Sequence, residues 1–237
     1  MEGFFLPFKQ KPGLSRYPMR VTGDPYLLNE VKSLVESNTL QELSVKEVFA
    51  EPGIYNRAFT VPKKDSAKRR MIFDQRPLNK CIDAGKFKIE ILREAMALLE
   101  PGDWQTSVDL TEAHLPINPN SRKYLRLAIV DGHQTRVFQY KALPMGLNVS
   151  PSLSIKLMKV SLANIRKCGV RIIAYIDHLL IMARSQRERE RESMLLTVWV
   201  LLELVKAGFT ANGAKSELDL KRKIVFLRMN IERWGWW

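Results

Sequence analysis

Hydrophobic and polar positions divide the chain into short segments with two kinds of periodicity. Residues 54–62 and 105–110 alternate like strands, and residues 71–73 return as a second strand after a basic turn. Asp24-Pro25 precedes apolar positions at 27, 28, 31, 34 and 35, whose spacing predicts a helix with one apolar face. The pattern therefore begins with a helix, a hairpin and a further strand.

The second half of the chain continues this alternation. The other expected elements are a helix at 89–99, a hairpin at 124–140, a helix at 151–168, a hairpin at 171–185, a helix at 189–207 and a strand at 224–229. The stretch MLLTVWVLLELV is apolar nearly all round, which predicts a core helix packed under the sheet. Because hairpins require antiparallel pairing, we predict an α/β protein of the α+β kind, with a mixed or antiparallel sheet and packed helices.

The amino-acid composition indicates what kind of molecule the protein binds. The 237 residues include 38 Lys and Arg against 25 Asp and Glu, a net charge of +13. This balance favours a polyanion, nucleic acid first and an acidic membrane second, although an unspecific basic surface is the simpler alternative. Two distant cysteines argue against a disulfide scaffold or a zinc site. With no visible signal peptide and no apolar stretch of about 20 residues, we expect an intracellular protein, cytoplasmic or nuclear, that does not enter membranes.

Two acids lie at the ends of predicted buried strands. Asp109 ends the strand in SVDLTEAHLPI, and Asp177 lies at the tip of the hairpin in AYIDHLL. Two carboxylates brought together repel each other unless a cation lies between them, and Mg²⁺ prefers such oxygen ligands. The alternative is that both are independent, solvated turn acids.

Six motifs in order decide between these alternatives. They are FTVPKKDSAKRRMIFDQRPLNK, SVDLTEAHLPI, LPMGLNVSPSLSIKLM, AYIDHLL, AGFTANGAKSEL and IVFLRMNIE. Their sequence and order resemble the reverse transcriptases of retrotransposons, most closely the DIRS-like and gypsy-like groups. The N-terminal arm resembles them more loosely.

The resemblance implies the fold of a right-hand polymerase. Its palm would be a ferredoxin-like antiparallel sheet with helices, joined to a fingers subdomain. We expect an N-terminal arm and helix at 1–50, the fingers hairpin and connecting helix at 51–104, and the palm at 105–237. A fingers-proximal insertion would occupy about 111–150, and no room would remain for a thumb or a ribonuclease H domain.

The implied activity is RNA-directed DNA synthesis. Asp109, Asp177 and the backbone carbonyl of Leu110 would bind two Mg²⁺ (or Mn²⁺) ions. A primer 3′-hydroxyl would then attack the α-phosphate of an incoming dNTP. The implied partners are an RNA/DNA template–primer duplex and dNTPs, and the oligomeric state is left open.

The resemblance also implies roles in dNTP binding. Lys64 and Arg70 would bind the triphosphate, with a solvated basic turn as the alternative. Gly146 would allow close approach of the backbone to the nucleotide. Lys215 would lie near the leaving pyrophosphate, and an ordinary surface lysine is the alternative. His114 occupies the place of the aromatic residue that blocks a ribose 2′-hydroxyl.

Three further residues would lie near primer and template. Tyr175 would support the catalytic turn and contact the primer end, although it is also a plain strand aromatic. Met145 stands where the family has Phe or Gln. Pro151 would begin the helix behind this loop.

His178 is the most serious departure from the family, which has a second catalytic Asp at this position. Neutral imidazole is a poor Mg²⁺ ligand and protonated imidazole repels the ion, so the site should be weakened. Ser66, Ser154 and Arg228 depart from the pattern as well. Two functions therefore remain: a reverse transcriptase, or a catalytically inactive retroelement remnant or domesticated nucleic-acid-binding module.

Overall fold

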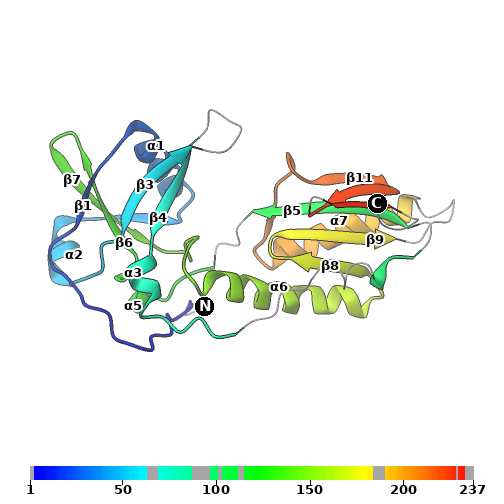
Figure 1. Cartoon of the computed structure of the whole chain (residues 1–237), viewed down its shortest axis with the longest axis horizontal. Helices are drawn as coiled ribbons and strands as arrows, with labels where there is room; N and C mark the ends of the chain where they lie inside the picture. The colour runs from blue at the N-terminus through cyan, green and yellow to red at the C-terminus, as the bar shows by residue number, and fades with distance from the viewer. Residues whose placement is uncertain are drawn as a thin grey trace. The chain divides into compact units, whose positions relative to one another are not determined.

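The chain divides into two compact units (Figure 1). The computed structural model describes residues 3–62, 69–86, 97–100, 103–111, 115–183, 190–227 and 229–232. Unit 1 comprises Met1–Gly85 and His114–Ser150, and unit 2 comprises Lys86–Ala113 and Pro151–Trp237. The basic turn at 63–68 and most of the helix predicted at 89–99 lie outside the described residues.

Unit 1 is built on a four-stranded sheet and a separate hairpin. The sheet has the order β1-β6-β7-β2, in which only the β1–β6 pair is parallel. Its strands are β1 (Arg20–Thr22), β2 (Leu40–Leu43), β6 (Arg126–Asp131) and β7 (Gln134–Tyr140). The hairpin pairs β3 (Arg57–Pro62) with β4 (Arg69–Asp74), as the alternation predicted.

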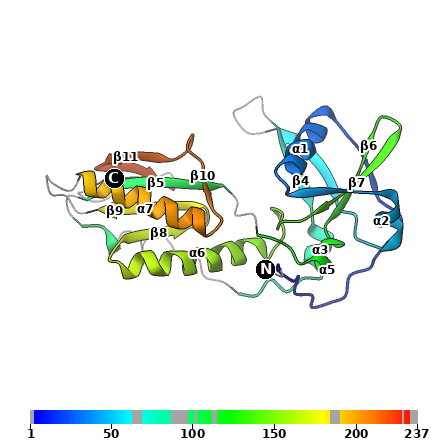
Figure 2. The ribbon, with the colours of Figure 1, turned by 180° about the vertical axis from the view of Figure 1, so that it is seen from behind.

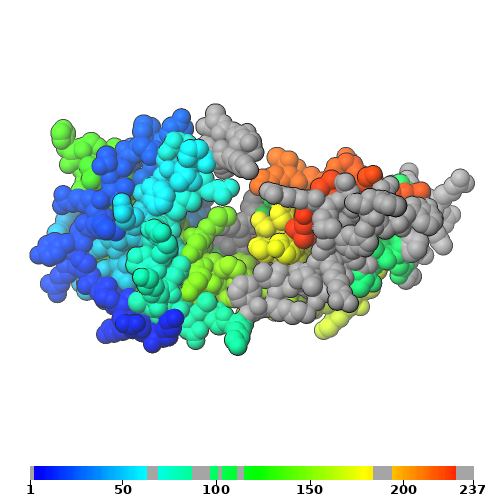
Figure 3. Space-filling model, in the orientation of Figure 1, coloured from blue at the N-terminus to red at the C-terminus, as the bar shows by residue number. Residues whose placement is uncertain are grey.

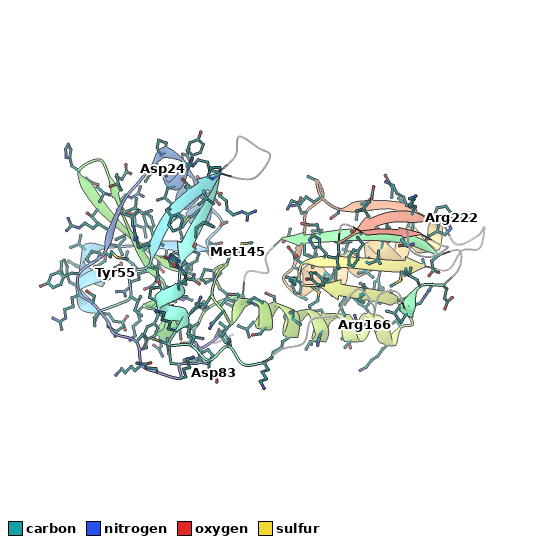
Figure 4. The ribbon with its side chains drawn as sticks, in the orientation of Figure 1. Asp24, Tyr55, Asp83, Met145, Arg166 and Arg222 are labelled. Atoms are coloured by element: carbon teal, nitrogen blue, oxygen red, sulfur yellow. The ribbon has the colours of Figure 1, made fainter. Side chains whose placement is uncertain are left out.

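The described residues of this unit also form the helices α1 (Pro25–Glu36), α2 (Val45–Ala50), α3 (Arg76–Asn79) and α5 (Pro119–Arg122). Asp24 caps α1 by accepting hydrogen bonds from the amides of Tyr26 and Leu27, and the Thr60 hydroxyl on β3 donates to its other oxygen (Figure 4). The helix predicted after Asp24-Pro25 is therefore confirmed. The same carboxylate also joins α1 to the hairpin.

Asp24→Ala should lower the free energy of unfolding by about 1 kcal/mol, because the substitution leaves helix amides unsatisfied. The hydrogen bond from the Leu27 amide holds the pKa of Asp24 below its ordinary value of 3.8. Its stabilisation is present above that value and should be lost as the pH falls further. Urea unfolding at pH 7 and at about pH 3 measures both effects. Asp24→Asn keeps the capping oxygen but loses the acceptor for the Thr60 hydroxyl, so it should retain most of the capping stability and lose the pH dependence.

The N-terminal arm is attached along its length to unit 1. Phe4 bridges to Ile117, Phe8 to Ile82, and the backbones of Ser15 and Gly53 exchange two hydrogen bonds at 2.9 Å. These bonds satisfy backbone groups of a segment that lacks regular structure.

Unit 2 contains an antiparallel sheet of order β10-β5-β9-β8, with β11 also pairing with β5. Its strands are β5 (Trp104–Thr111), β8 (Arg171–Tyr175), β9 (His178–Ala183), β10 (Thr210–Ala211) and β11 (Glu217–Lys221). A second hairpin joins β12 (Lys223–Phe226) to β13 (Met229–Glu232).

Two helices, α6 (Ser150–Lys167) and α7 (Glu190–Lys206), lie on one face of this sheet (Figures 1 and 2). They bury residues such as Leu162 and Val200 against Val108 and Leu179. Residues of the opposite face pack instead against Ile224 and Phe226 of β12. The two faces arise because successive strand residues point to opposite sides. None of the described helices is long and apolar enough to cross a bilayer.

The prediction that residues 189–207 form a helix buried in the core is wrong for one side of α7. Thr197, Val200 and Leu204 are buried, but the opposite side exposes Met194, Leu195, Val198, Leu202 and Val205. A helix lying on one face of a sheet packs only one stripe against it. The apolar residues on the other side have no partner in the described part of this unit.

Candidate functional site

The candidate site begins with the alternation of side chains along β5. Val108 and Leu110 point into the core beneath the helices. Asp109, between them, points to the other face of the sheet and is only 7% exposed. The strand thus fixes a nearly buried carboxylate close to its end.

The β8–β9 hairpin supplies the second acid through a two-residue turn, Ile176-Asp177. Ile176 has φ +57°, a conformation that a β-branched residue rarely adopts and that costs about 1–3 kcal/mol. Positive φ at the first turn position matches the twist of hairpin strands. The yellow segment of these strands reaches the surface on the face seen in Figure 3.

His178, the first residue of β9, lies directly across from Asp109. The Leu110 amide donates to the Asp177 carbonyl at 2.7 Å. The Asp109–His178 pair is therefore of the non-hydrogen-bonded kind, in which facing side chains come closest. Accordingly, Nδ1 of His178 lies 3.2 Å from Oδ2 of Asp109.

Asp177 lies beside this pair, at the turn. Its side chain is 54% exposed, and its Oδ1 atom lies 3.6 Å from Nε2 of His178. The imidazole thus contacts one carboxylate with each ring nitrogen. The two acids that the sequence predicted to lie together are thus both in contact with this one ring.

The loop after β10 fixes the backbone of Asp109 from the other side. The Asp109 amide donates to the Ser216 hydroxyl at 3.0 Å, and the Asp109 carbonyl accepts from the Asn212 amide at 2.7 Å. Nζ of Lys215 lies 4.0 Å from Oδ1 of Asp109. Sequence reasoning selected Lys215 but missed Asn212 and Ser216, although both belong to the motif AGFTANGAKSEL.

Ser216→Ala should lower the free energy of unfolding by about 1–2 kcal/mol, because it leaves the Asp109 amide without an acceptor. Ser216→Thr keeps the hydroxyl and is the matched control. Urea unfolding of the two variants measures the difference. Equal losses in both variants would contradict a role for the hydroxyl.

The donor set fits a divalent metal only in part. Among the described residues, no group of three or more His, Cys, Asp or Glu side chains is arranged to hold a metal ion. The carboxylates of Asp109 and Asp177 are suitable ligands for Mg²⁺. His178 is not, and its ring contacts both carboxylates, so a cation shared by the two acids requires this ring to move.

The other predicted site residues fall into three groups. Tyr175, Leu110 and Lys215 belong to unit 2 with the acids; Tyr175 pairs with His178 across the hairpin, and Pro151 lies in the first turn of α6. Arg70, Met145 and Gly146 belong to unit 1. Lys64 and His114 lie outside the described residues.

The Met145-Gly146 loop is held in place by Asn79. The Asn79 side chain donates to the Gly146 carbonyl at 2.9 Å and accepts from the Asn148 amide at 3.0 Å. Gly146 has φ +94°, which explains a glycine here independently of any close approach by a nucleotide. Met145 beside it is 68% exposed (Figure 4), and Arg70 on β4 is also exposed.

Comparison with known proteins identifies the family. The family model described as reverse transcriptase (RNA-dependent DNA polymerase) matches residues 61–231. The chain therefore belongs to the reverse transcriptase family, which confirms the resemblance inferred from its motifs.

The transposon Tf2-7 and Tf2-3 polyproteins of Schizosaccharomyces pombe are each 24% identical over 234 residues. The match covers 99% of this chain and 16% of either polyprotein. Among solved structures, the foamy viral protease-reverse transcriptase dRH in complex with ds DNA matches with a TM-score of 0.66 and 19% identity. That match covers 96% of this chain and 38% of the viral chain, and it supports a shared mixed α/β fold.

Proposed function

We propose that the chain is the fingers-and-palm part of a reverse transcriptase, with unit 2 as palm and unit 1 as fingers. In unit 2 the elements follow the order β5-α6-β8-β9-α7-β10, and the sheet has the order β10-β5-β9-β8. This β-α-β-β-α-β succession supports a ferredoxin-like palm. The proposal assigns the arm at 1–50 and the segment at 111–150 largely to the fingers.

The proposed activity is nucleotidyl transfer from a dNTP to a primer 3′-hydroxyl. The observation that carries it is that Asp109 and Asp177 both contact one side chain at the end of the sheet. Both acids and the Leu110 carbonyl would hold Mg²⁺ or Mn²⁺. When bound, the metal would stabilise the negative charge that develops on the transferred phosphate.

The basic side chains would bind the triphosphate, and an aromatic side chain would support the catalytic turn. Lys215 would lie near the leaving pyrophosphate, and Lys64 and Arg70 would neutralise the triphosphate. Tyr175 would support the turn beneath the primer end. Gly146 would leave room for the nucleotide.

The proposed partner is a template–primer duplex. The foamy viral relative has been solved with ds DNA, and a net charge of +13 suits a polyanion. Binding through phosphates should weaken as salt rises, because each contact releases counterions.

His178 favours a second candidate, a nucleic-acid-binding module that no longer polymerises. Its imidazole stands across from Asp109, where it contacts both acids and supplies no oxygen ligand. A chain of this kind would bind duplex without extending it.

Primer extension on an RNA template with Mg²⁺ or Mn²⁺ tests the two candidates. The polymerase proposal expects extension by the parent chain and a loss of at least about 100-fold in Asp109→Asn and in Asp177→Asn. Asp219→Asn, an equivalent change at an exposed strand position of the same unit, should extend like the parent. Salt-dependent duplex binding without extension would establish the second candidate, and no binding would reject both.

A further inference from the structure

The N-terminal arm presents a surface that carries positive charge only. Residues 3–23 contain no Asp or Glu, and Lys9, Lys11, Arg16 and Arg20 in this stretch are all exposed. Figure 1 shows the arm, in dark blue, running along the outside of unit 1. Like charges held along one segment repel one another unless an anion neutralises them. This surface therefore suits a partner that carries several negative charges in a row.

The acids that border the arm are engaged elsewhere and do not offset this charge. Glu51 lies two residues before the glycine that bridges to the arm, and it pairs with Lys123 and Arg126. Asp24 accepts from helix amides and from a threonine hydroxyl. Asp83 accepts from the amide two residues further along the chain. Within the described residues, none of the four arm cations forms an ion pair.

Tyr17 adds an accessible aromatic ring to this basic surface. It is 80% exposed, more than any other large hydrophobic residue that the structure describes. Its backbone is nevertheless fixed, because the Tyr17 amide donates to Oγ of Ser15 and that hydroxyl donates to the Tyr17 carbonyl, both at 3.0 Å. Ser15 is joined in turn to Gly53 by two backbone hydrogen bonds. A ligand that stacks on this ring therefore has little backbone entropy to remove.

We propose that residues 9–20 of the arm bind single-stranded nucleic acid. The ring of Tyr17 stacks on an unpaired base, and Arg16 and Arg20, which precede and follow it, contact the phosphates. A duplex fits this ring poorly, because its bases are already paired and stacked on one another. An anionic membrane also fits poorly, because the described part of the arm contains no helix, and segments that enter a membrane interface are usually amphipathic helices.

This binding surface is separate from the candidate catalytic site. The arm belongs to unit 1, whereas Asp109 and Asp177 belong to unit 2. Binding by the arm requires neither a metal ion nor catalysis, so the inference applies to a polymerase and to an inactive nucleic-acid-binding module alike. Its failure would not affect the proposed duplex binding or primer extension.

Fluorescence anisotropy of a labelled oligo-U RNA of about 12 nucleotides, titrated with the full chain, tests the stacking. Tyr17→Ala should weaken binding about 5- to 100-fold, because one base loses its aromatic partner. Tyr17→Phe keeps the aromatic face and should bind within about twofold of the parent. Tyr26→Ala removes another exposed tyrosine of unit 1 and should bind like the parent. An unchanged affinity in Tyr17→Ala, or an equal loss in Tyr26→Ala, would overturn the proposal.

The salt dependence of the same binding tests the cations. Each phosphate contact on a single strand contributes about 0.7 to the slope of log K against log salt concentration. Arg16→Ala/Arg20→Ala should therefore reduce the slope by about 1.4, whereas Tyr17→Ala should lower the affinity and keep the slope. Lys32→Ala/Lys46→Ala removes the same charge from exposed positions of α1 and α2 and should keep the parent slope. An equal reduction in both double variants would show that net charge, not the arm, is responsible, and would overturn the proposal.

Two other ligands distinguish single strands from the alternative partners. A blunt duplex of the same length should bind Tyr17→Ala as tightly as the parent, and a loss as large as that for oligo-U would overturn the preference for unpaired bases. Vesicles of phosphatidylserine and phosphatidylcholine should not distinguish the parent from Tyr17→Ala. Vesicle binding that depends on Tyr17, with oligo-U binding unaffected, would assign the arm to a membrane instead.

Discussion

His178→Asp should raise the affinity of the site for Mn²⁺ about 10- to 100-fold and raise primer extension by a similar factor. The substitution removes the ring that contacts both carboxylates and adds an oxygen ligand opposite Asp109. Mn²⁺ binding followed by electron paramagnetic resonance measures the first effect without requiring activity. Extension of a labelled primer measures the second.

His178→Asn is the matched control for this prediction, because it removes the imidazole without adding a carboxylate. It should recover only a small part of the gain in metal affinity. Equal affinity in the Asp and Asn variants would mean that the ring obstructs the site and that charge is unimportant. A parent chain that already extends primers as fast as His178→Asp would contradict our account of this position.

Arg171→Ala should lower the free energy of unfolding by about 3–5 kcal/mol, because it leaves a buried carboxylate unpaired. The Asp103 side chain is 2% exposed and binds the Arg171 guanidinium through two contacts of 2.6 Å. The pair joins the start of β8 to the residue that precedes β5. Urea unfolding followed by far-ultraviolet circular dichroism measures the loss.

Two controls separate this buried pair from an ordinary surface interaction. Lys221→Ala removes a half-exposed ion pair with Glu217 in the same unit and should cost at most about 1 kcal/mol. The double variant Asp103→Leu/Arg171→Met removes both charges and should recover much of the loss. A double variant as unstable as Arg171→Ala alone would show that the uncompensated charge is not the cause.

The sequence indicated which residues form the candidate site, but not the geometry in which they meet. The alternation at 105–110 and the two apolar runs at 171–185 were sufficient to place Asp109 near the end of a strand and Asp177 at the tip of a hairpin. The fact that His178 stands opposite Asp109 depends on the register of β5 against β9, which couples residues about 70 positions apart. A motif read along one strand contains no information about that register.

Long-range polar partners were the least predictable features. Nothing near Asp103 in the sequence indicates Arg171, because the contact depends on how β5 and β8 are placed in one sheet. Ser216 lay within a recognised motif, but its role is to satisfy a backbone amide rather than to supply chemistry. The prediction that α7 is buried on all sides failed for a different reason. An apolar sequence does not show whether a neighbouring element covers each side of a helix.

The discontinuous composition of unit 1 has a consequence for synthesis on the ribosome. Among the residues that the structure describes, β1 pairs with β6 and β2 pairs with β7, and the chain encodes both partners roughly a hundred residues later. The bridge from Phe4 in the N-terminal arm to Ile117 likewise cannot form until Ile117 has been synthesised. The emerging N-terminal segment therefore carries strands with unpaired edges while residues 86–113, which belong to unit 2, are being made. Unit 1 can close only after β7 has been translated, so the first 113 residues alone form no complete folding unit.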